Sequence, residues 1–395
     1  MIDFTLRNQT DIIFGKDAEK ECGKLLKEFG GTKVLLHHSG EPFVLPLIKK
    51  VKNILADEGL PYVELVGVVP NPRLSLVYEG IELCRREKID CILAVGGGSV
   101  IDSAKAIGIG VPYDGDVWDF FLGKLYPSKS LPVGVISTFA GTGSETTRAS
   151  VITKEEDGLK RSADDADVIK PKFAILNPEL TFTVPNYQTA SGIADITSHL
   201  MENYFSATEG AEFSDWLLVA GLKSVLKNGP IVVQQPENYN ARGELMLVAP
   251  FCINGILKVG RAGDWACHFL EHEMSAEWDI PHGEGLAVVT PVWMRYVYKK
   301  NVELFAKFAT RVFNVDYDFD CPEATALKGI EMVEDFFMRL GLPAKIGDFK
   351  NIDDVNNSTL RKMAARIPFY GPGNTIGSIC PLDENDCYEI FRRCL

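Results

Sequence analysis

Short apolar runs alternate with segments of helical spacing through the first half of the chain. The runs are Lys33–His38, Tyr62–Val69, Cys91–Val95 and Leu131–Ile136, and the segments of helical spacing include Ala18–Phe29, Phe43–Glu58 and Leu74–Lys88. A strand that is apolar on both faces is typical of a parallel sheet buried on both sides. The alternation therefore predicts an α/β domain with helices over both faces of its sheet.

The pattern changes after Gly192, where helical spacing dominates and strand-like runs become scarce. The helical segments are 193–206, 213–227, 239–259, 264–278, 286–313 and 325–340, and we expect the fifth to break near Pro291. A chain of 395 residues is longer than one hydrophobic core normally serves. We therefore expect two domains, an α/β dinucleotide-binding domain over 1–186 and an all-α domain over 187–395.

Composition excludes several classes of partner and location. The formal charge of −13 argues against nucleic acid and anionic membranes, which both attract a basic surface. No run approaches eighteen apolar residues, and the start, Met1-Ile2-Asp3-Phe4, lacks the pattern of a signal peptide. The nine cysteines are odd in number and scattered, as in an enzyme with reduced thiols. We expect a cytoplasmic enzyme.

Two loops rich in small residues follow predicted strands. The first is Gly96–Ser99, which opens a helical segment, and the second is Phe139–Glu145. Glycines let backbone N–H groups approach an anion, and a helix N-terminus carries a partial positive charge. The alternative for either loop alone is a tight turn that binds nothing. Together they would lie where such sheets bind nucleotides.

Histidines gather in the helical half of the chain. Asp195 and His199 stand four residues apart, which places both side chains on one face of a helix. His268 and His282 could supply two further ligands, and four of the six histidines fall in these segments. Burying such a group without a cation is costly. The sequence therefore predicts a divalent metal site.

These motifs, in this order and over essentially the whole chain, resemble the iron-containing (group III) alcohol dehydrogenases, and the butanol-dehydrogenase and aldehyde-reductase branch in particular. The resemblance implies a metal on Asp195, His199, His268 and His282, with Fe²⁺ expected and Zn²⁺ or Mn²⁺ as alternatives. It also implies a homodimer and a small aldehyde or alcohol as substrate. The cofactor-binding positions that it implies are Ser39, Asn71, Gly97, Gly98, Ser99, Asp102, Thr138, Thr142 and Lys160, with Leu180 near the nicotinamide.

Three imidazoles and one carboxylate would leave a coordination position for a substrate oxygen, beside the hydride-carrying nicotinamide. His272 lies one helical turn after His268 and could be a ligand, a proton relay or a packed core residue; the resemblance favours a relay or a substrate contact. Asp264 is expected to cap the helix that begins at Trp265 rather than to bind metal.

The loop after the second strand favours NAD over NADP, although NADP is not excluded. The strand ends in His37-His38-Ser39-Gly40-Glu41, and no Lys or Arg follows until Lys49. A carboxylate on Glu41 would repel the 2′-phosphate of NADP. The alternative is that Glu41 is simply solvated.

Two arginines bear on the substrate. Arg148 stands where relatives usually carry a small or neutral residue, and Arg261 precedes the third predicted ligand. Our hypothesis is that they bind an acidic head group on a short aldehyde, such as sulfoacetaldehyde. The alternatives are that both pair with carboxylates, and that the substrate is a plain alkyl aldehyde of the butanol type. Rival functions are a lyase similar to dehydroquinate synthase, with NAD and Zn²⁺, and a non-enzymatic protein that retains the fold.

Overall fold

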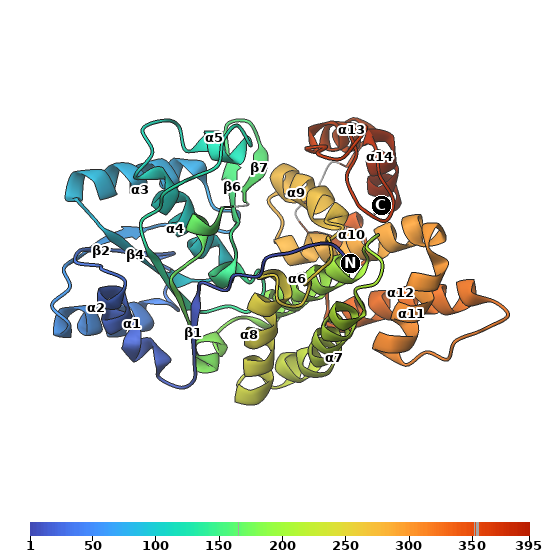
Figure 1. Cartoon of the computed structure of the whole chain (residues 1–395), viewed down its shortest axis with the longest axis horizontal. Helices are drawn as coiled ribbons and strands as arrows, with labels where there is room; N and C mark the ends of the chain where they lie inside the picture. Colours follow the sequence, from blue (N-terminus) through green and yellow to red (C-terminus); the bar gives the residue numbers. More distant parts are fainter. Residues whose placement is uncertain (165, 351, 353–354) are drawn as a thin grey trace. The chain divides into compact units, whose positions relative to one another are not determined.

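The computed structural model describes residues 1–164, 166–350, 352 and 355–395. They form two compact units (Figure 1). The α/β unit consists of Arg7–Val184 and Pro236–Pro250, and the helical unit consists of Met1–Leu6, Pro185–Gln235 and Phe251–Leu395. The division at Val184 lies two residues from the expected boundary. The sequence analysis did not predict that Met1–Leu6 belongs to the helical unit and Pro236–Pro250 to the α/β unit.

A six-stranded parallel sheet organises the α/β unit, in the order β1-β8-β5-β4-β2-β3. Strand β3 lies on one side of β2, and β4 lies on the other side. The strand order therefore reverses between β2 and β4. Such a reversal is the place where open α/β sheets bind ligands. The strands are β1 (Asp11–Phe14), β2 (Val34–His38), β3 (Tyr62–Val66), β4 (Cys91–Gly96), β5 (Val133–Ser137) and β8 (Phe173–Leu176), and an antiparallel hairpin is formed by β6 (Ser150–Lys154) and β7 (Leu159–Ala163).

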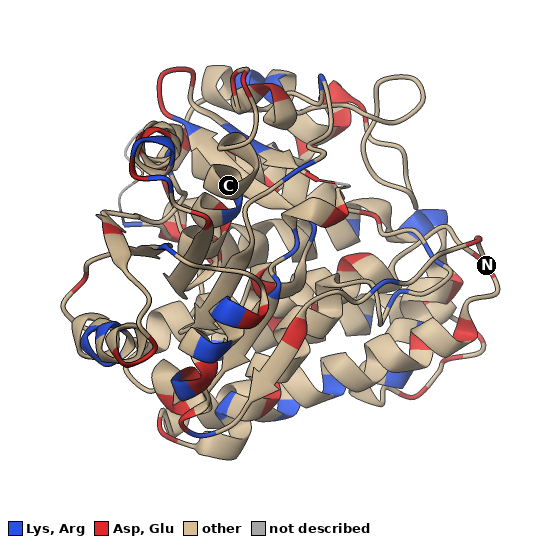
Figure 2. Ribbon diagram, turned by 60° about the vertical axis from the view of Figure 1, so that its left-hand side comes forward, with Lys and Arg blue, Asp and Glu red and all other residues tan. Residues whose placement is uncertain are grey.

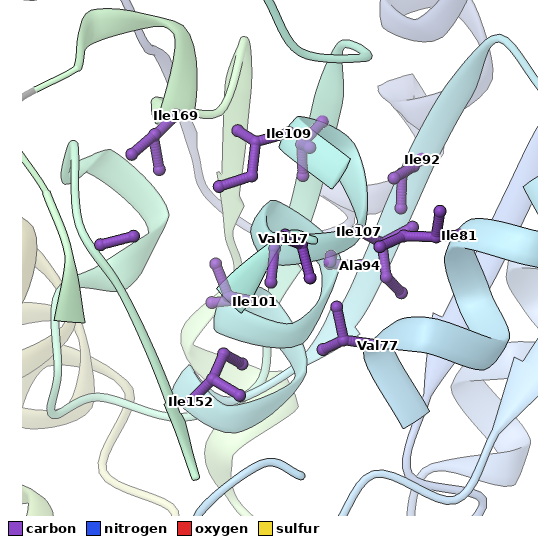
Figure 3. Close-up of a cluster of buried hydrophobic side chains, with 14 of the residues drawn as sticks. Val77, Ile81, Ile92, Ala94, Ile101, Ile107, Ile109, Val117, Ile152 and Ile169 are labelled. Carbon is purple, nitrogen blue, oxygen red and sulfur yellow. The ribbon is translucent and has the colours of Figure 1, made fainter. Parts of the chain in front are cut away.

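Each face of the sheet carries its own hydrophobic core. In β4, Ile92 and Ala94 belong to the core with α3 and α4 (Figure 3), whereas Cys91, Leu93 and Val95 belong to the core with α1 and α2. Alternate side chains of a strand point to opposite faces, so a continuous apolar run serves both cores. The prediction of a sheet covered on both sides is confirmed. The helices of this unit are α1 (Cys22–Glu28), α2 (Leu45–Asp57), α3 (Leu74–Glu87), α4 (Gly98–Gly110), α5 (Trp118–Phe121) and most of α8 (Tyr239–Ile253).

The helical unit packs α6 against α7 and α10, α9 against α10, and α11 against α12. The predicted break at Pro291 was wrong, because α10 continues through this proline and the chain turns only at Tyr298–Asn301. The residues around Pro291 are buried, and their packing outweighs the hydrogen bond that proline removes. The helices are α6 (Asn186–Tyr204), α7 (Glu212–Gln234), α9 (Ala266–Trp278), α10 (His282–Val297), α11 (Val302–Phe313), α12 (Pro322–Arg339), α13 (Asn357–Arg366) and α14 (Glu384–Arg393).

One helix of the described residues, α7, is long and apolar enough to cross a membrane by length and composition alone. Its residues Leu218, Leu222 and Val225 are buried, and the helix packs against α6 and α11. Core packing therefore accounts for part of its apolar composition, since 44% of the apolar window is buried. Acidic and basic residues are interspersed along the helices (Figure 2), so the net charge of −13 is not gathered on a single element.

Candidate active site

Helix α6 presents the first two predicted metal ligands one turn apart. Asp195 and His199 are both buried, and the Nδ1 atom of His199 lies 3.3 Å from Oδ1 of Asp195. Residues 189–204 of α6 are buried, because α7, α9 and α10 all pack against this helix. A polar pair in such surroundings is costly unless something satisfies it.

The other two predicted ligands come from α9 and α10. The Nε2 atoms of His268 and His282 lie 3.7 and 3.8 Å from Oδ1 of Asp195. These three residues offer ligand atoms within 4.8 Å of one another, a separation that one metal ion can bridge. His199 lies beside the group, with its ring stacked on His268 at 4.4 Å between centroids. The structure thus brings together all four residues predicted from the sequence.

Three polar atoms at the centre of this group lack a hydrogen-bond partner among the described residues. They are Oδ1 of Asp195, Nδ1 of His199 and Nε2 of His268, all buried. Buried polar atoms are nearly always satisfied, so three orphaned atoms at one point indicate a ligand. All three are ligand atoms for a divalent cation, and the set of one carboxylate and three imidazoles suits iron or zinc. The residues therefore fit the metal that the sequence predicts.

The charges of the group also suit a cation. Burial alone would raise the pKa of Asp195, but the surrounding imidazoles outweigh it and lower the pKa to about 2. Burial lowers the pKa of His199 to about 3, against the opposing effect of Asp195. Asp195 is therefore ionised and the His199 ring neutral at pH 7, which are the forms that bind a metal. Against the effect of burial, the carboxylates of Glu202 and Asp195 raise the pKa of His268 to about 10, so a bound metal would take the place of a proton on that ring.

Two carboxylates that the sequence analysis missed stand behind the histidines. Glu202 pairs with Nδ1 of His268, and Glu271 pairs with Nδ1 of His282. Both glutamates are completely buried. Glu202 lies two turns after Asp195 on the same face of α6, and that spacing is the one signal the sequence offered.

His272 and Asp264 flank the group. The His272 ring lies 5.5 Å from that of His282 and 6.5 Å from that of His268, between centroids, and with Glu271 and His282 it forms a second set of atoms at metal-binding separation. Asp264 accepts a hydrogen bond from the N–H of Ala266, the first residue of α9, and others from Ser378 and Ile379. Asp264 therefore satisfies the first N–H of α9, but it is not the N-cap residue as expected, because the helix begins at Ala266 and Trp265 occupies the N-cap position.

The predicted nucleotide loops follow the carboxyl ends of the parallel strands. Gly97–Ser99 follows β4, Thr138 and Thr142 follow β5, and Ser39 follows β2, on either side of the reversal in strand order. The loops after β4 and β5 approach so closely that a Cβ on Gly98 would lie 2.5 Å from the Thr142 side chain. Only glycine allows this approach, and helix α4 begins there with its N–H groups available to an anion.

A buried lysine ties the second loop to α4. Lys105 donates to the carbonyl oxygens of Ser144 and Ala149, at 2.7 and 2.6 Å, and to the hydroxyls of Ser144 and Thr147. Ser144 in turn donates to Asp102 at 2.5 Å. Burial lowers the pKa of Lys105 to about 8 despite the nearby Asp102. These bonds fix the backbone between Ser144 and Ala149 against the first turns of α4.

The remaining predicted cofactor residues are Asn71, Lys160, Leu180 and Ser39. Asn71 is buried in a left-handed conformation (φ 54°) after β3. Lys160 is buried on β7. Burial raises the pKa of Asp102, and the charges of Lys105 and Lys160 partly offset this increase. Leu180 follows β8 and packs against the core with α1 and α2. The Ser39 hydroxyl accepts a hydrogen bond from Glu41, whose side chain is exposed.

The two arginines of the substrate hypothesis differ in environment. Arg261 is buried, pairs with Asp215 at 2.5 Å and donates to the carbonyl oxygens of Asn203 and Tyr204. This is the alternative that the sequence left open, a guanidinium committed to a carboxylate. Arg148 is exposed. The pKa of Asp167 is lowered mainly by its hydrogen bond with Lys170, and the charge of Arg148 adds to this effect.

Comparison with known families decides the relationship. A model described as iron-containing alcohol dehydrogenase matches residues 9–178, and one described as the C-terminal region of the Fe-containing alcohol dehydrogenase family matches residues 189–372. The chain belongs to the iron-containing alcohol dehydrogenase family. It is an oxidoreductase, and the fold expected from the resemblance is confirmed.

Individual family members match over the full length of the chain. The probable NADH-dependent butanol dehydrogenase 2 of Bacillus subtilis is 40% identical over 395 residues, and NADH-dependent butanol dehydrogenase A of Clostridium acetobutylicum is 37% identical over 394 residues, each with 100% of both chains covered. The NADPH-dependent aldehyde reductase YqhD of Escherichia coli is 31% identical, over 88% of this chain and 89% of its own. The crystal structure of NADH-dependent butanol dehydrogenase A from Thermotoga maritima superposes with a TM-score of 0.94 at 34% identity, covering 100% of this chain and 99% of that one.

Proposed function

We propose that the protein is a metal-dependent, NAD(H)-linked enzyme that interconverts a short aldehyde and its primary alcohol. The observation that carries the proposal is the convergence of three buried, unsatisfied ligand atoms from Asp195, His199 and His268, with His282 beside them. The family membership and the relatives named as NADH-dependent butanol dehydrogenases support it.

In this proposal Asp195, His199, His268 and His282 hold one divalent cation. We expect Fe²⁺, and Zn²⁺ or Mn²⁺ are the alternatives that this donor set accommodates. The cation supplies a Lewis acid that stabilises negative charge on the substrate oxygen, and the nicotinamide supplies the hydride acceptor or donor. Asp195 would supply a negative charge that compensates the cation, and the three imidazoles would complete the set of residues that hold it. His272, one turn from His268, carries the proton between the substrate oxygen and solvent.

The cofactor would bind along the carboxyl edge of the parallel sheet. Its diphosphate would lie on the N–H groups of Gly97–Ser99 at the start of α4, with Asp102, Thr138, Thr142, Lys160, Asn71 and Ser39 around it and Leu180 beside the nicotinamide. The exposed carboxylate of Glu41, after β2, favours NADH because it repels a 2′-phosphate.

The substrate in this proposal is a short uncharged aldehyde such as butanal. The hypothesis of an acidic head group depended on two guanidinium groups, and that of Arg261 is committed to Asp215 and two backbone carbonyls. Arg148 remains and is solvent-exposed, where an ion pair contributes little. We therefore propose that kcat/KM is higher for butanal than for sulfoacetaldehyde.

We also propose a homodimer in the cytoplasm. The N-terminal segment exposes Met1, Ile2, Phe4 and Leu6, and β1 lies at an edge of the sheet with β8 as its neighbour. Exposed apolar side chains beside an edge strand favour pairing with a second copy. All nine cysteines are free, which supports a reducing compartment.

The test is metal analysis and turnover on the same preparation. Purified protein should contain close to one transition-metal ion per chain and should oxidise one NADH for each butanal consumed. The isosteric variant Asp195→Asn should lose both properties. A lyase would not consume NADH stoichiometrically, and a non-enzymatic protein would not turn over at all. A wild-type protein without metal, or one inactive on every short aldehyde after reconstitution with Fe²⁺ or Zn²⁺, would refute the proposal.

A further inference from the structure

Two completely buried carboxylates, Glu202 and Glu271, contact the metal-site histidines on the side away from the orphaned atoms. A buried carboxylate must be compensated by donors or by a positive charge. In both residues the compensation comes from a histidine that also faces Asp195, so each glutamate is coupled to the proposed cation through an imidazole ring.

Glu202 accepts three hydrogen bonds. Its Oε1 atom accepts from the backbone N–H groups of Cys267 and His268, at 2.6 and 3.3 Å, and its Oε2 atom pairs with Nδ1 of His268. The carboxylate thus stands at the N-terminus of α9, where the helix dipole favours negative charge. A carboxylate can only accept, so Nδ1 of His268 must carry the proton. When the ring is neutral, the lone pair is therefore on Nε2, and this is the atom that lies 3.7 Å from Oδ1 of Asp195.

Glu271 acts on His282 with different partners. One oxygen accepts from the hydroxyl of Ser275 one turn later, and the other pairs with Nδ1 of His282. Helix α10 makes room for this contact, because a Cβ at Gly285 would lie 2.7 Å from Cγ of Glu271 and 2.8 Å from its Oε1. The space occupied by the Glu271 carboxylate depends on a residue without a side chain.

We propose that Glu202 and Glu271 are positioning residues, which hold His268 and His282 in the tautomer and orientation that direct Nε2 at the cation and so set the metal affinity. The inference rests on the metal site proposed above and adds to it two residues that do not touch the metal. Partners of this kind orient ligating histidines and strengthen their basicity, and their loss typically lowers metal affinity about 10- to 100-fold.

The two glutamates should not be equivalent when each is changed to glutamine. A glutamine at position 202 would have only one acceptor oxygen, whereas three donors face this side chain: the backbone N–H groups of Cys267 and His268 and the imidazole of His268. Either its NH₂ group opposes the N–H groups of Cys267 and His268, or it donates to Nδ1 and forces the proton onto Nε2, where it blocks the metal. At position 271 the amide oxygen can still accept from His282, while the NH₂ group donates to Ser275, whose hydroxyl can donate to the carbonyl oxygen of Ile280 at 3.2 Å.

The experiment compares Co²⁺ binding to the full-length apoprotein of wild type, Glu202→Gln, Glu271→Gln, Glu271→Ala and a control, Glu277→Gln. Glu277 lies on the same helix α9 but pairs with Lys362 and Arg366, away from the histidines. Affinity is measured by competition with a chelator, and the ligand set by the visible absorption spectrum of bound Co²⁺. Circular dichroism checks that each variant is folded.

We expect Glu202→Gln to weaken Co²⁺ binding about 100-fold and to change the spectrum, because one imidazole leaves the coordination sphere. Glu271→Gln should weaken binding about 10-fold or less with the wild-type spectrum, Glu271→Ala more than Glu271→Gln, and Glu277→Gln not at all.

Equal affinities and identical spectra for wild type and Glu202→Gln would overturn the inference. If Glu202→Gln does not fold, equal affinities for Glu271→Gln and Glu271→Ala would overturn it. A wild-type protein that binds no Co²⁺ would instead refute the metal site itself, so the two failures are distinguishable.

Discussion

Replacing Gly283 by alanine tests how closely α6 and α10 must approach for the proposed metal site to form. Gly283 follows His282 in the first turn of α10, and a Cβ added there would lie 1.9 Å from the carbonyl oxygen of Ser191 on α6. Ordinary van der Waals contact begins near 3.4 Å. Since the obstacle is backbone and cannot rotate away, α10 must move from α6 by roughly 1.5 Å.

Two effects of this substitution oppose each other. Alanine is a better helix former than glycine by about 1 kcal/mol, which alone would stabilise α10. Overpacking a well-filled interface costs about 1–3 kcal/mol, and here the strain lies at the start of the helix that carries His282. We expect the overpacking to dominate, with a lower free energy of unfolding for the helical unit.

The catalytic effect should exceed the effect on stability. Nε2 of His282 lies 3.8 Å from Oδ1 of Asp195, and a shift of about 1 Å can reduce a rate about 100-fold. We expect Gly283→Ala to lower kcat/KM for butanal by about that factor and to retain less metal after dialysis against a chelator.

The assays are NADH oxidation at saturating cofactor, metal content by mass spectrometry, and chemical denaturation. The matched control is Gly347→Ala in the same unit, where the added Cβ would meet only Cε of Lys345 at 4.0 Å. Metal content, kcat/KM and unfolding midpoint indistinguishable from wild type in Gly283→Ala would refute this reasoning about the approach of the two helices.

Three further predictions concern the α/β unit. Burial raises the pKa of Glu145 to about 7 from 4.5, so the native state holds this proton at higher pH than the unfolded state does, and stability is lost as pH rises between those values. The free energy of unfolding of the wild type should fall by about 2–3 kcal/mol between pH 5 and pH 8, and this fall should be absent in Glu145→Gln. Equal pH profiles of the two proteins would contradict the prediction. Because Arg148 is exposed, Arg148→Ala should leave KM for butanal within about twofold of wild type, and a selective rise in KM for sulfoacetaldehyde would revive the acidic-head hypothesis. Glu41→Lys should lower KM for NADPH about tenfold with little change for NADH, and an unchanged cofactor preference would show that Glu41 is merely solvated.

The parallel sheet with helices over both faces could be predicted because strands such as β4 contribute side chains to both cores. Strand β4 is apolar at every position from Cys91 to Val95, a pattern that is typical of a parallel strand covered on both faces. The predicted helix break at Pro291 was wrong because a prediction from local sequence includes the hydrogen bond that proline removes but not the packing of the buried residues on either side of it.

The convergence of Asp195 and the histidines could be predicted because a metal site would restrict the residue types and would place two of its ligands one turn apart, as Asp195 and His199 stand on α6. The glutamates behind them could not be found in this way. Glu202 contacts His268 across 66 positions of sequence, and a buried glutamate carries no local pattern that names its partner. The role of Arg261 could not be predicted for the same reason, since it depends on Asp215, which lies 46 positions earlier on helix α7.

The exchange of short segments between the two units has a consequence for synthesis of the chain. The α/β unit lacks residues 236–250 until Pro250 has left the ribosome, and by then α6 has emerged without α9 and α10, which pack against it in the folded protein. At about 5–20 residues per second, the rest of the chain takes on the order of 10 s to appear. During that interval the apolar surface of α6 is available to chaperones or to misassembly. For the same reason, neither unit can be produced alone as a single uninterrupted piece of this polypeptide.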